Sequence, residues 1–221
     1  MKAPKSGGSG HLLDAASALA PGRGRARPID AAAVTEVALR IVDEEDLGAL
    51  TMRRLAQELG VAIATVYSAT GGKENILNSL VEHILGEVPV AAAESVAWDE
   101  GIVGLLTAVH EAFIAHPAVA HLALLRRVTG PTSLRIQETV VRLLRSGGLD
   151  AAAVGRAYAV LTSYVMGFTM LRISRMHDRA GVPTFSAAAF PEAAAFAPVL
   201  AEETSTAGFD RALRHLVRSF A

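Results

Sequence analysis

The chain has 221 residues, a formal net charge of −1, and a composition that is 51% hydrophobic but only 5% aromatic. It contains no cysteine, which excludes disulfides, thiolate nucleophiles and thiolate metal sites and fits a reducing cytoplasm. The near-zero net charge excludes a general attraction of the whole chain to nucleic acid or membranes. Since much of the hydrophobic fraction is alanine, we expect an all-α protein with closely packed helices.

The chain begins with a segment rich in glycine and serine, and residues 1–24 are predicted to form a disordered leader. Residues 23–27 then read RGRAR. Arg25 and Arg27 of this basic arm are predicted to contact DNA, along the phosphates or in a minor groove. A solubilising tail would have the same composition, so that interpretation stays open.

Hydrophobic periodicity predicts four helices in an N-terminal DNA-binding domain of residues 25–88. In chain order, they begin at Asp30, Met52, Ile63 and Lys73. Asp30 and Thr51 are suitable N-cap residues, and Gly60 permits a turn between the second and third helices. The fourth helix carries a wide apolar stripe and is ended by Pro89.

A second domain is predicted over residues 95–221, after a connector of small residues at 91–97. We expect its helices at residues 98–115, 118–127, 131–145, 150–176 and 207–220. A loop is predicted at 178–191, with a short helix after it. The longest uncharged run, residues 157–171, has 15 residues. A membrane-spanning helix needs roughly 20, so this run is predicted to be a buried helix and no membrane partner is expected.

Residues 51–73 read TMRRLAQELGVAIATVYSATGGK and combine a capped helix, a glycine turn and a second short helix. Their length lets the two helices pack at a steep angle, which would present the second to a DNA major groove. Ala56 is small where the helices would cross, and Val66 fills the joint. Any two helices joined by a glycine would show most of these features, so the pattern alone leaves a purely structural role open.

The run ALRIVDEEDLGALTMRRLAQELGV, the pair Val66-Tyr67 and the continuation KENIL together resemble the N-terminal domain of TetR-family repressors. The resemblance covers residues 29–85 with matching spacing. The rest of the chain is similar to the ligand-binding domain of the subgroup that includes the tetracycline repressor, because Trp98-Asp99, the helix break at His116 and a later long helix follow in the same order.

This resemblance implies DNA contacts for the residues that match the family's pattern. Thr51, Thr65, Tyr67 and Lys73 match positions that meet phosphates, and Arg53 is implied to reach the groove or the backbone. Hydroxyls and a lysine at helix N-termini suit phosphate contacts, whereas an arginine can pair with the edge of a guanine. A role for Tyr67 as a packing aromatic between helices is the alternative.

The predicted recognition helix departs from the family pattern. Ser68 to Gly72 stand where an aromatic or histidine and another bulky residue are usual, and few side chains can hydrogen-bond to base edges. We therefore expect Ile63 and Ala64 to contact thymine methyl groups, with DNA shape adding to specificity. Acidic residues outnumber basic ones in this domain. A basic edge can therefore bind DNA only if the acidic residues lie on the face away from the DNA.

A catalytic function is the second hypothesis, because seven histidines lie mostly in the C-terminal half. No HExxH or comparable ligand spacing occurs, so no enzyme activity, metal site or cofactor is predicted. The histidine that holds metal-bound tetracycline in the tetracycline repressor falls near Arg126 here. A metal–tetracycline ligand is therefore not supported.

The C-terminal half is instead predicted to hold a small apolar effector in a pocket between helices. His110, Phe113, Met166 and Met170 are the expected lining residues, although methionines at helical spacing are also common in plain cores. A homodimer is expected through the helices at 150–176 and 207–220. Its predicted apolar faces are Ala157, Leu161, Tyr164, Phe209, Leu213, Leu216 and Val217.

Together these features predict a cytoplasmic, ligand-responsive transcriptional regulator. A two-fold dimer would place two recognition helices roughly 34–36 Å apart on a near-palindromic operator in double-stranded DNA. We expect a repressor whose effector shifts the helix ending near Gly86 and so releases the operator. A small-molecule-binding or scaffolding protein with degenerate DNA binding is the alternative.

Overall fold

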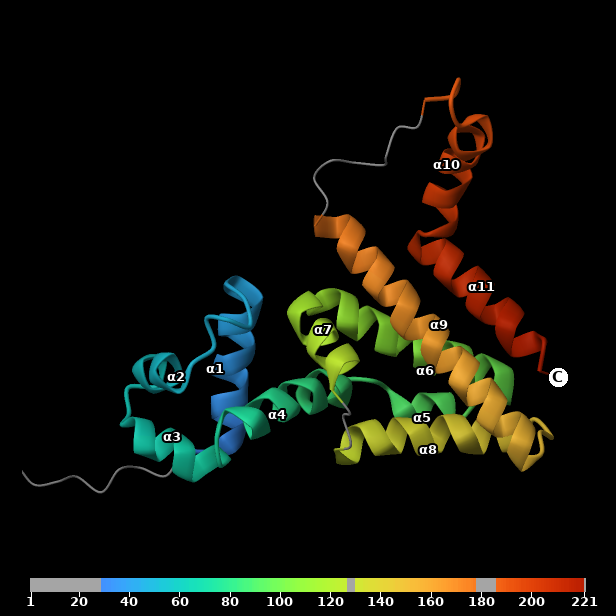
Figure 1. The fold of residues 1–221 in the computed structure, drawn as a ribbon. Helices are drawn as coiled ribbons and strands as arrows, with labels where there is room; N and C mark the ends of the chain where they lie inside the picture. The colour runs from blue at the N-terminus through green and yellow to red at the C-terminus, as the bar shows by residue number, and fades with distance from the viewer. Residues whose placement is uncertain (1–28, 127–129, 178–185, 221) are drawn as a thin grey trace, which may run out of the picture.

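The structure, a computed structural model, describes residues 29–126, 130–177 and 186–220. Within these ranges it is entirely helical, with eleven helices and no strand, which confirms the predicted all-α class (Figure 1). The helices are α1 (Ala31–Glu44), α2 (Met52–Glu58), α3 (Ile63–Thr70), α4 (Lys73–Gly86), α5 (Val90–Ala93), α6 (Trp98–Ala115), α7 (Pro117–Leu125), α8 (Pro131–Ser146), α9 (Ala151–His177), α10 (Pro191–Glu203) and α11 (Thr206–Arg218). The predicted leader and the arm residues Arg25 and Arg27 lie outside the described residues.

Helices α1, α2 and α3 and the first half of α4 form a small unit, called the head below (Figure 1). Helix α1 begins where predicted, because the Asp30 carboxylate accepts a hydrogen bond from the Ala32 N–H at 3.1 Å. Its apolar side chains, spaced three and four residues apart, are buried: Val34, Ala38, Ile41 and Val42. The head core is therefore built from the periodicity visible in the sequence.

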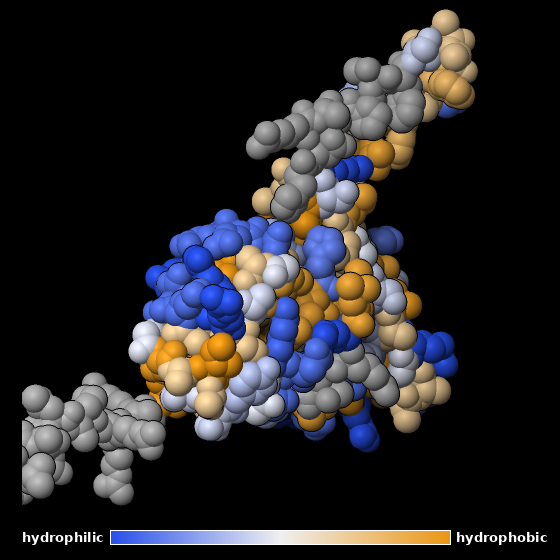
Figure 2. All heavy atoms as spheres, turned by 60° about the vertical axis from the view of Figure 1, so that its left-hand side comes forward, coloured by the Kyte–Doolittle hydropathy of each residue, from blue (hydrophilic) through white to orange (hydrophobic). Residues whose placement is uncertain are grey.

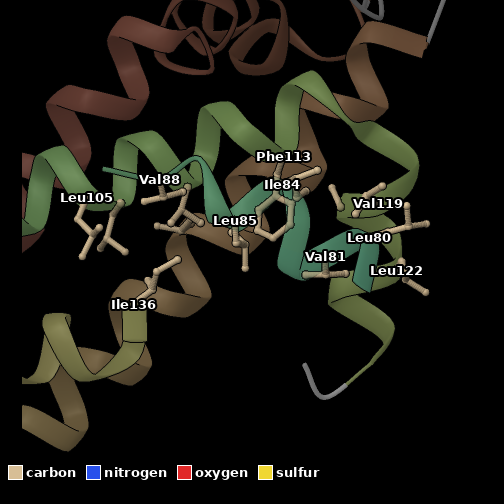
Figure 3. Close-up of a cluster of buried hydrophobic side chains, with 14 of the residues drawn as sticks. Leu80, Val81, Ile84, Leu85, Val88, Leu105, Phe113, Val119, Leu122 and Ile136 are labelled. Atoms are coloured by element: carbon tan, nitrogen blue, oxygen red, sulfur yellow. The ribbon is translucent and has the colours of Figure 1, made fainter. Parts of the chain in front are cut away.

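Helix α4 joins the head to the body, which is formed by its second half and α5–α11. It packs against α1 and α3 of the head and against α6, α7 and α8 of the body. Figure 3 shows Leu80, Val81, Ile84 and Leu85 of α4 among apolar side chains of the neighbouring helices. Because one continuous helix is buried in both units, a displacement of α4 in the body must also move the head.

Helix α6 is the centre of the body and contacts α5, α7, α8, α9 and α11. The connector predicted at residues 91–97 is wrong in part, since Val90–Ala93 forms the short helix α5. Alanine is the strongest helix former, which explains this turn. Helix α5 can lie against α6 because Gly101 has no side chain: a Cβ there would overlap the Ala93 carbonyl oxygen.

Helices α9 and α11 run beside each other along the body, and both pack against α6. This overturns most of the predicted dimer face. Five of its residues are at most 1% exposed within the single chain: Ala157, Leu161, Phe209, Leu213 and Val217. The apolar stripe of each helix faces inward because the two helices and α6 bury one another, and a second copy cannot reach it.

Helix α10 projects away from the body (Figure 1). None of its residues is buried, and its apolar residues Phe196 and Val199 are more than half exposed. Among the described residues, no single helix is long and apolar enough to cross a bilayer. Helices α6 and α7 meet such a criterion only when taken together, and they bend by 114° at their junction.

Candidate DNA interface and ligand cavity

Helices α2 and α3 form the predicted helix-turn-helix. The Thr51 hydroxyl caps α2 by accepting a hydrogen bond from the Arg54 N–H at 3.1 Å. Gly60 has φ +66°, a left-handed conformation that a side chain would disfavour, and the Val61 N–H then bonds to the Ala56 carbonyl at 3.0 Å. The turn therefore needs its glycine, and it directs α3 across α2.

Val66 is the one fully buried side chain of helix α3, and Ala69 is half-buried against the same core. Ile63 is 43% exposed and Tyr67 50%, although both are apolar or aromatic. Ala64 is exposed beside them, and Thr65 is half-buried. Figure 2 shows orange and pale side chains gathered low on the head, below a hydrophilic upper part. Helix α3 thus offers a largely apolar face with few hydrogen-bonding groups.

The turn between α3 and α4 depends on two consecutive glycines, Gly71 with φ +76° and Gly72 with φ +125°. The Asn75 side-chain N–H bonds to the last carbonyl of α3, that of Thr70, at 2.9 Å. A Cβ on Gly72 would lie 3.7 Å from the Tyr67 ring, so the ring sits over this glycine. The turn therefore fixes Tyr67 and the start of α4, where Lys73 lies, relative to each other.

The arginines of the head differ in whether they pair with carboxylates of the head itself. The Arg54 guanidinium lies 3.1 Å from Glu45 and 3.0 Å from Glu58, and Glu58 also pairs with Arg40 at 3.2 Å. By contrast, Arg53 is exposed and forms no salt bridge with any described residue. Of the basic residues of α2, only Arg53 is thus available for an external anion.

One carboxylate of the head contacts the body and so does not lie at the predicted DNA-binding edge. Asp43, at the end of α1, lies 2.9 Å from Nδ1 of His116 at the α6–α7 junction. This contact ties the C-terminal end of α1 to the body.

The body contains a cavity of about 280 Å³ between α4, α6, α7, α8 and α9. Its walls are mostly apolar, and its polar lining residues are Ser133, Gln137, Tyr158 and Thr162. Val81 and Leu85 of α4 form part of the wall. Two of the predicted ligand residues, Phe113 and Met166, line this cavity, whereas His110 and Met170 do not.

His110 lies in an aromatic cluster next to the cavity. Its Nδ1 is 2.8 Å from the Thr169 hydroxyl, and its ring stacks on Phe209 with centroids 4.0 Å apart. The Thr169 hydroxyl donates its proton to the Val165 carbonyl at 2.6 Å, so Nδ1 of His110 donates to Thr169. Burial and the charge of Arg172 lower the pKa of His110 to about 4, so it is neutral at pH 7.

Sequence reasoning did not single out the polar lining residues Ser133, Gln137, Tyr158 and Thr162. They come from two different helices, and no spacing in the sequence relates one helix to the other. Arg126, which aligns near the metal-binding histidine of the tetracycline repressor, pairs with Glu74 on α4 and is not among the lining residues. No group of three His, Asp or Glu side chains that could hold a metal occurs in the described part of the chain.

Known proteins share this arrangement. Residues 91–217 match the family model described as "Tetracyclin repressor-like, C-terminal domain". An HTH-type transcriptional regulator of Saccharopolyspora erythraea is 27% identical over 195 residues, which cover 85% of this chain and 83% of that protein.

Two solved structures are also similar. ActR of Streptomyces coelicolor, in complex with actinorhodin, has a TM-score of 0.72 at 28% identity and covers 88% of this chain and 97% of that one. BioQ with its double-stranded DNA operator has a TM-score of 0.58 at 29% identity and covers 69% of this chain and 92% of that one.

A helix-turn-helix head joined by one helix to a helical body with a cavity is the architecture of a ligand-responsive DNA-binding regulator. The comparisons favour this class over the catalytic and scaffolding alternatives. The chain belongs to the TetR family of transcriptional regulators, and its C-terminal half is the tetracycline-repressor-like domain of that family.

Proposed function

We propose that this regulator is a repressor that leaves its operator when a small apolar effector enters the cavity. The observation that carries the proposal is the shared helix: Val81 and Leu85 of α4 line the cavity, and the first residues of the same helix lie beside the recognition helix α3. A ligand that displaces α4 would change the position of the head. Residues 25–88 would then act as the DNA-binding domain and residues 95–221 as the sensor, in the cytoplasm where the DNA is.

The cavity favours an effector without formal charge. None of its lining residues is Asp, Glu, Lys or Arg, so a charged group would lose its hydration without gaining a partner. The Tyr158 hydroxyl and the Gln137 amide offer hydrogen bonds that would orient a ring bearing hydroxyl or carbonyl groups. The complex of the similar ActR with actinorhodin supports a small-molecule effector.

On the DNA side, we propose that Thr51, Thr65, Tyr67 and Lys73 contact phosphates and fix the register of the head. Arg53 is the side chain that reads a base edge or an adjacent phosphate. Apolar contacts of Ile63 and Ala64 with thymine methyl groups supply the remaining direct recognition, together with DNA shape. Arg25 and Arg27 would extend these contacts along the DNA.

We further propose a homodimer formed through the outer face of α9. Small exposed residues recur along this face at helical spacing: Ala152, Ala159, Ser163, Gly167 and Ser174. Small side chains let two such helices approach closely, and half-buried Met170 lies on the same face by its spacing. The exposed apolar residues of α10, which have no place in the protomer core, would cover the second copy. Two heads would then face a near-palindromic operator.

Ser163→Arg tests the dimer. We expect this variant to sediment as a monomer in analytical ultracentrifugation, because a long charged side chain at the centre of the α9 face prevents close approach. Glu138→Arg, on an exposed position of α8, is the control and should remain a dimer. A dimeric Ser163→Arg protein would refute the α9 interface.

The repressor function is tested with DNA selected for binding by the purified full chain. Fluorescence anisotropy should show tight, salt-dependent binding, and an uncharged fused-ring phenol such as 1,8-dihydroxyanthraquinone should release the DNA if it fills the cavity. Binding of this compound can be followed by fluorescence, since Trp98 is the sole tryptophan. Failure to select any preferred duplex would contradict the proposed repressor.

A further inference from the structure

Glu82, on α4, caps the N-terminus of α8. Its carboxylate accepts hydrogen bonds from the backbone N–H of Thr132 at 2.6 Å and of Ser133 at 3.2 Å, and also from the Ser133 hydroxyl. The N-cap of α8 itself, Gly130, has no side chain to accept these bonds, and Pro131 at the first helical position has no N–H. Glu82 therefore supplies from another helix what an N-cap side chain normally supplies.

The surrounding backbone is shaped for this carboxylate. A Cβ on Gly130 would overlap the carboxyl carbon and one oxygen of Glu82. Partial burial alone would raise the pKa of Glu82, but the hydrogen bonds from Ser133 and Thr132 together outweigh burial and hold the pKa below its ordinary value. The Glu82 carboxylate is thus charged at neutral pH, and this charge favours its interaction with a helix N-terminus.

The cap lies at the edge of the cavity. Ser133 lines the cavity while its hydroxyl donates to Glu82, and Val81, the neighbour of Glu82, lines it from α4. Leu85 and Ile136, one turn further along the two helices, continue the same wall. The same segments of α4 and α8 therefore form both the wall and the cap.

A ligand that fills the cavity is expected to disrupt the hydrogen bonds of the Glu82 cap. The cavity volume of about 280 Å³ is below the roughly 300–1,000 Å³ that ligand sites usually occupy. A ligand larger than this volume presses on the helices that line the cavity, and α4 and α8 are two of them. Separating these helices pulls the Glu82 carboxylate away from the N–H groups of α8.

We propose that Glu82 is the positioning residue that couples the cavity to the head. The cap is formed when α4 holds the head in its operator-binding position, and it is broken when a ligand parts α4 from α8. This inference rests on the proposed function, since it assumes that operator and effector favour different positions of α4. Removing the cap should then lower the affinity for operator DNA and raise the affinity for a cavity ligand. From the usual contribution of a helix cap, each change should be roughly fivefold.

Two variants break the cap by different routes. Glu82→Gln removes the charge and one acceptor oxygen. Gly130→Ala keeps the carboxylate but puts a methyl group in the position that the carboxylate occupies. Glu74→Gln is the control, because Glu74 is an exposed carboxylate of the same helix that is bonded to Arg126 and not to α8. Affinities are measured for a duplex selected with the wild-type protein and for 1,8-dihydroxyanthraquinone. Both cap variants should bind DNA more weakly and the probe more tightly, and the control should do neither. A merely structural loss would weaken both affinities together, and that outcome would overturn the proposal.

A distance measurement decides the role of Glu82 without DNA or probe. The chain has no cysteine, so spin labels can be placed at Asn78→Cys on α4 and Arg135→Cys on α8, both exposed positions. In both cap variants the distance between the labels should be longer or more broadly distributed than in the wild-type background. An unchanged distribution would overturn the proposal. A wild-type protein that binds no DNA would instead contradict the proposed repressor function, while the distance comparison would still stand.

Discussion

Gly71→Ala should destabilise the protein because Gly71 closes the turn between the recognition helix and α4. Its φ of +76° lies in the left-handed region, which costs a residue with a side chain about 1–2 kcal/mol. The new Cβ would also lie 2.6 Å from the Asn75 side-chain nitrogen, so Asn75 must turn away and lose its hydrogen bond to the Thr70 carbonyl. Such a bond contributes about 0.5–1.5 kcal/mol. The sum predicts a loss of about 1.5–3.5 kcal/mol in the free energy of unfolding.

Urea denaturation followed by circular dichroism measures this loss. Gly104→Ala is the matched control: Gly104 lies within α6, has no positive φ, and would place its Cβ at least 4 Å from any neighbouring group. This control should be stabilised by about 0.5–1 kcal/mol, since alanine favours a helix. Operator affinity should fall in Gly71→Ala, because the turn also positions Tyr67. If Gly71→Ala were as stable as the wild type, the strain argument for this turn would be refuted.

Three further predictions follow from exposed charge, buried histidine and cavity volume. Arg53→Ala should weaken operator binding and lower the slope of log affinity against log salt by about one if Arg53 meets a phosphate, whereas Arg54→Ala, whose guanidinium already pairs with acids, should change this slope little. His110 has a pKa below that of the unfolded chain, so stability should fall as pH decreases through the range between about 6.5 and 4. Urea unfolding should show that this residue lowers the free energy of unfolding by on the order of 2 kcal/mol between pH 7 and 5. His110→Phe should lack this loss. Equal losses in both proteins would contradict the assignment of the loss to His110. Ala123→Phe places a ring in the cavity, so it should abolish probe binding while operator affinity persists in the anisotropy assay, and continued release of DNA by the probe would place the effector site elsewhere.

Much of the head was predictable because its signals are local. The Asp30 and Thr51 caps, the turn at Gly60 and the apolar spacing of α1 depend on residues a few positions apart, and each has the predicted geometry. The same holds for α6, whose ends at Trp98 and Ala115 coincide with the prediction. The exposure of Ile63 and Tyr67 is consistent with a DNA-facing role, but their contacts with DNA remain predictions.

The inner faces of α9 and α11 were misassigned because periodicity shows that a helix has an apolar side without showing what covers it. Leu161 and Phe209 satisfy the pattern of a dimer face and the pattern of a core equally well, and only their burial against α6 decides between the two. His110 raises the same difficulty. Its sequence neighbours do not reveal that Thr169 and Phe209 surround it.

The sequence by itself determined the helical class, the helix-turn-helix and the family resemblance, because capping, turn geometry and helical periodicity are properties of neighbouring residues. The tertiary structure alone decided which side chains line the cavity and that Glu82 caps α8 across 50 residues of chain. These features depend on the angles and contacts between helices that are distant in the sequence, and those are set by packing of the whole core.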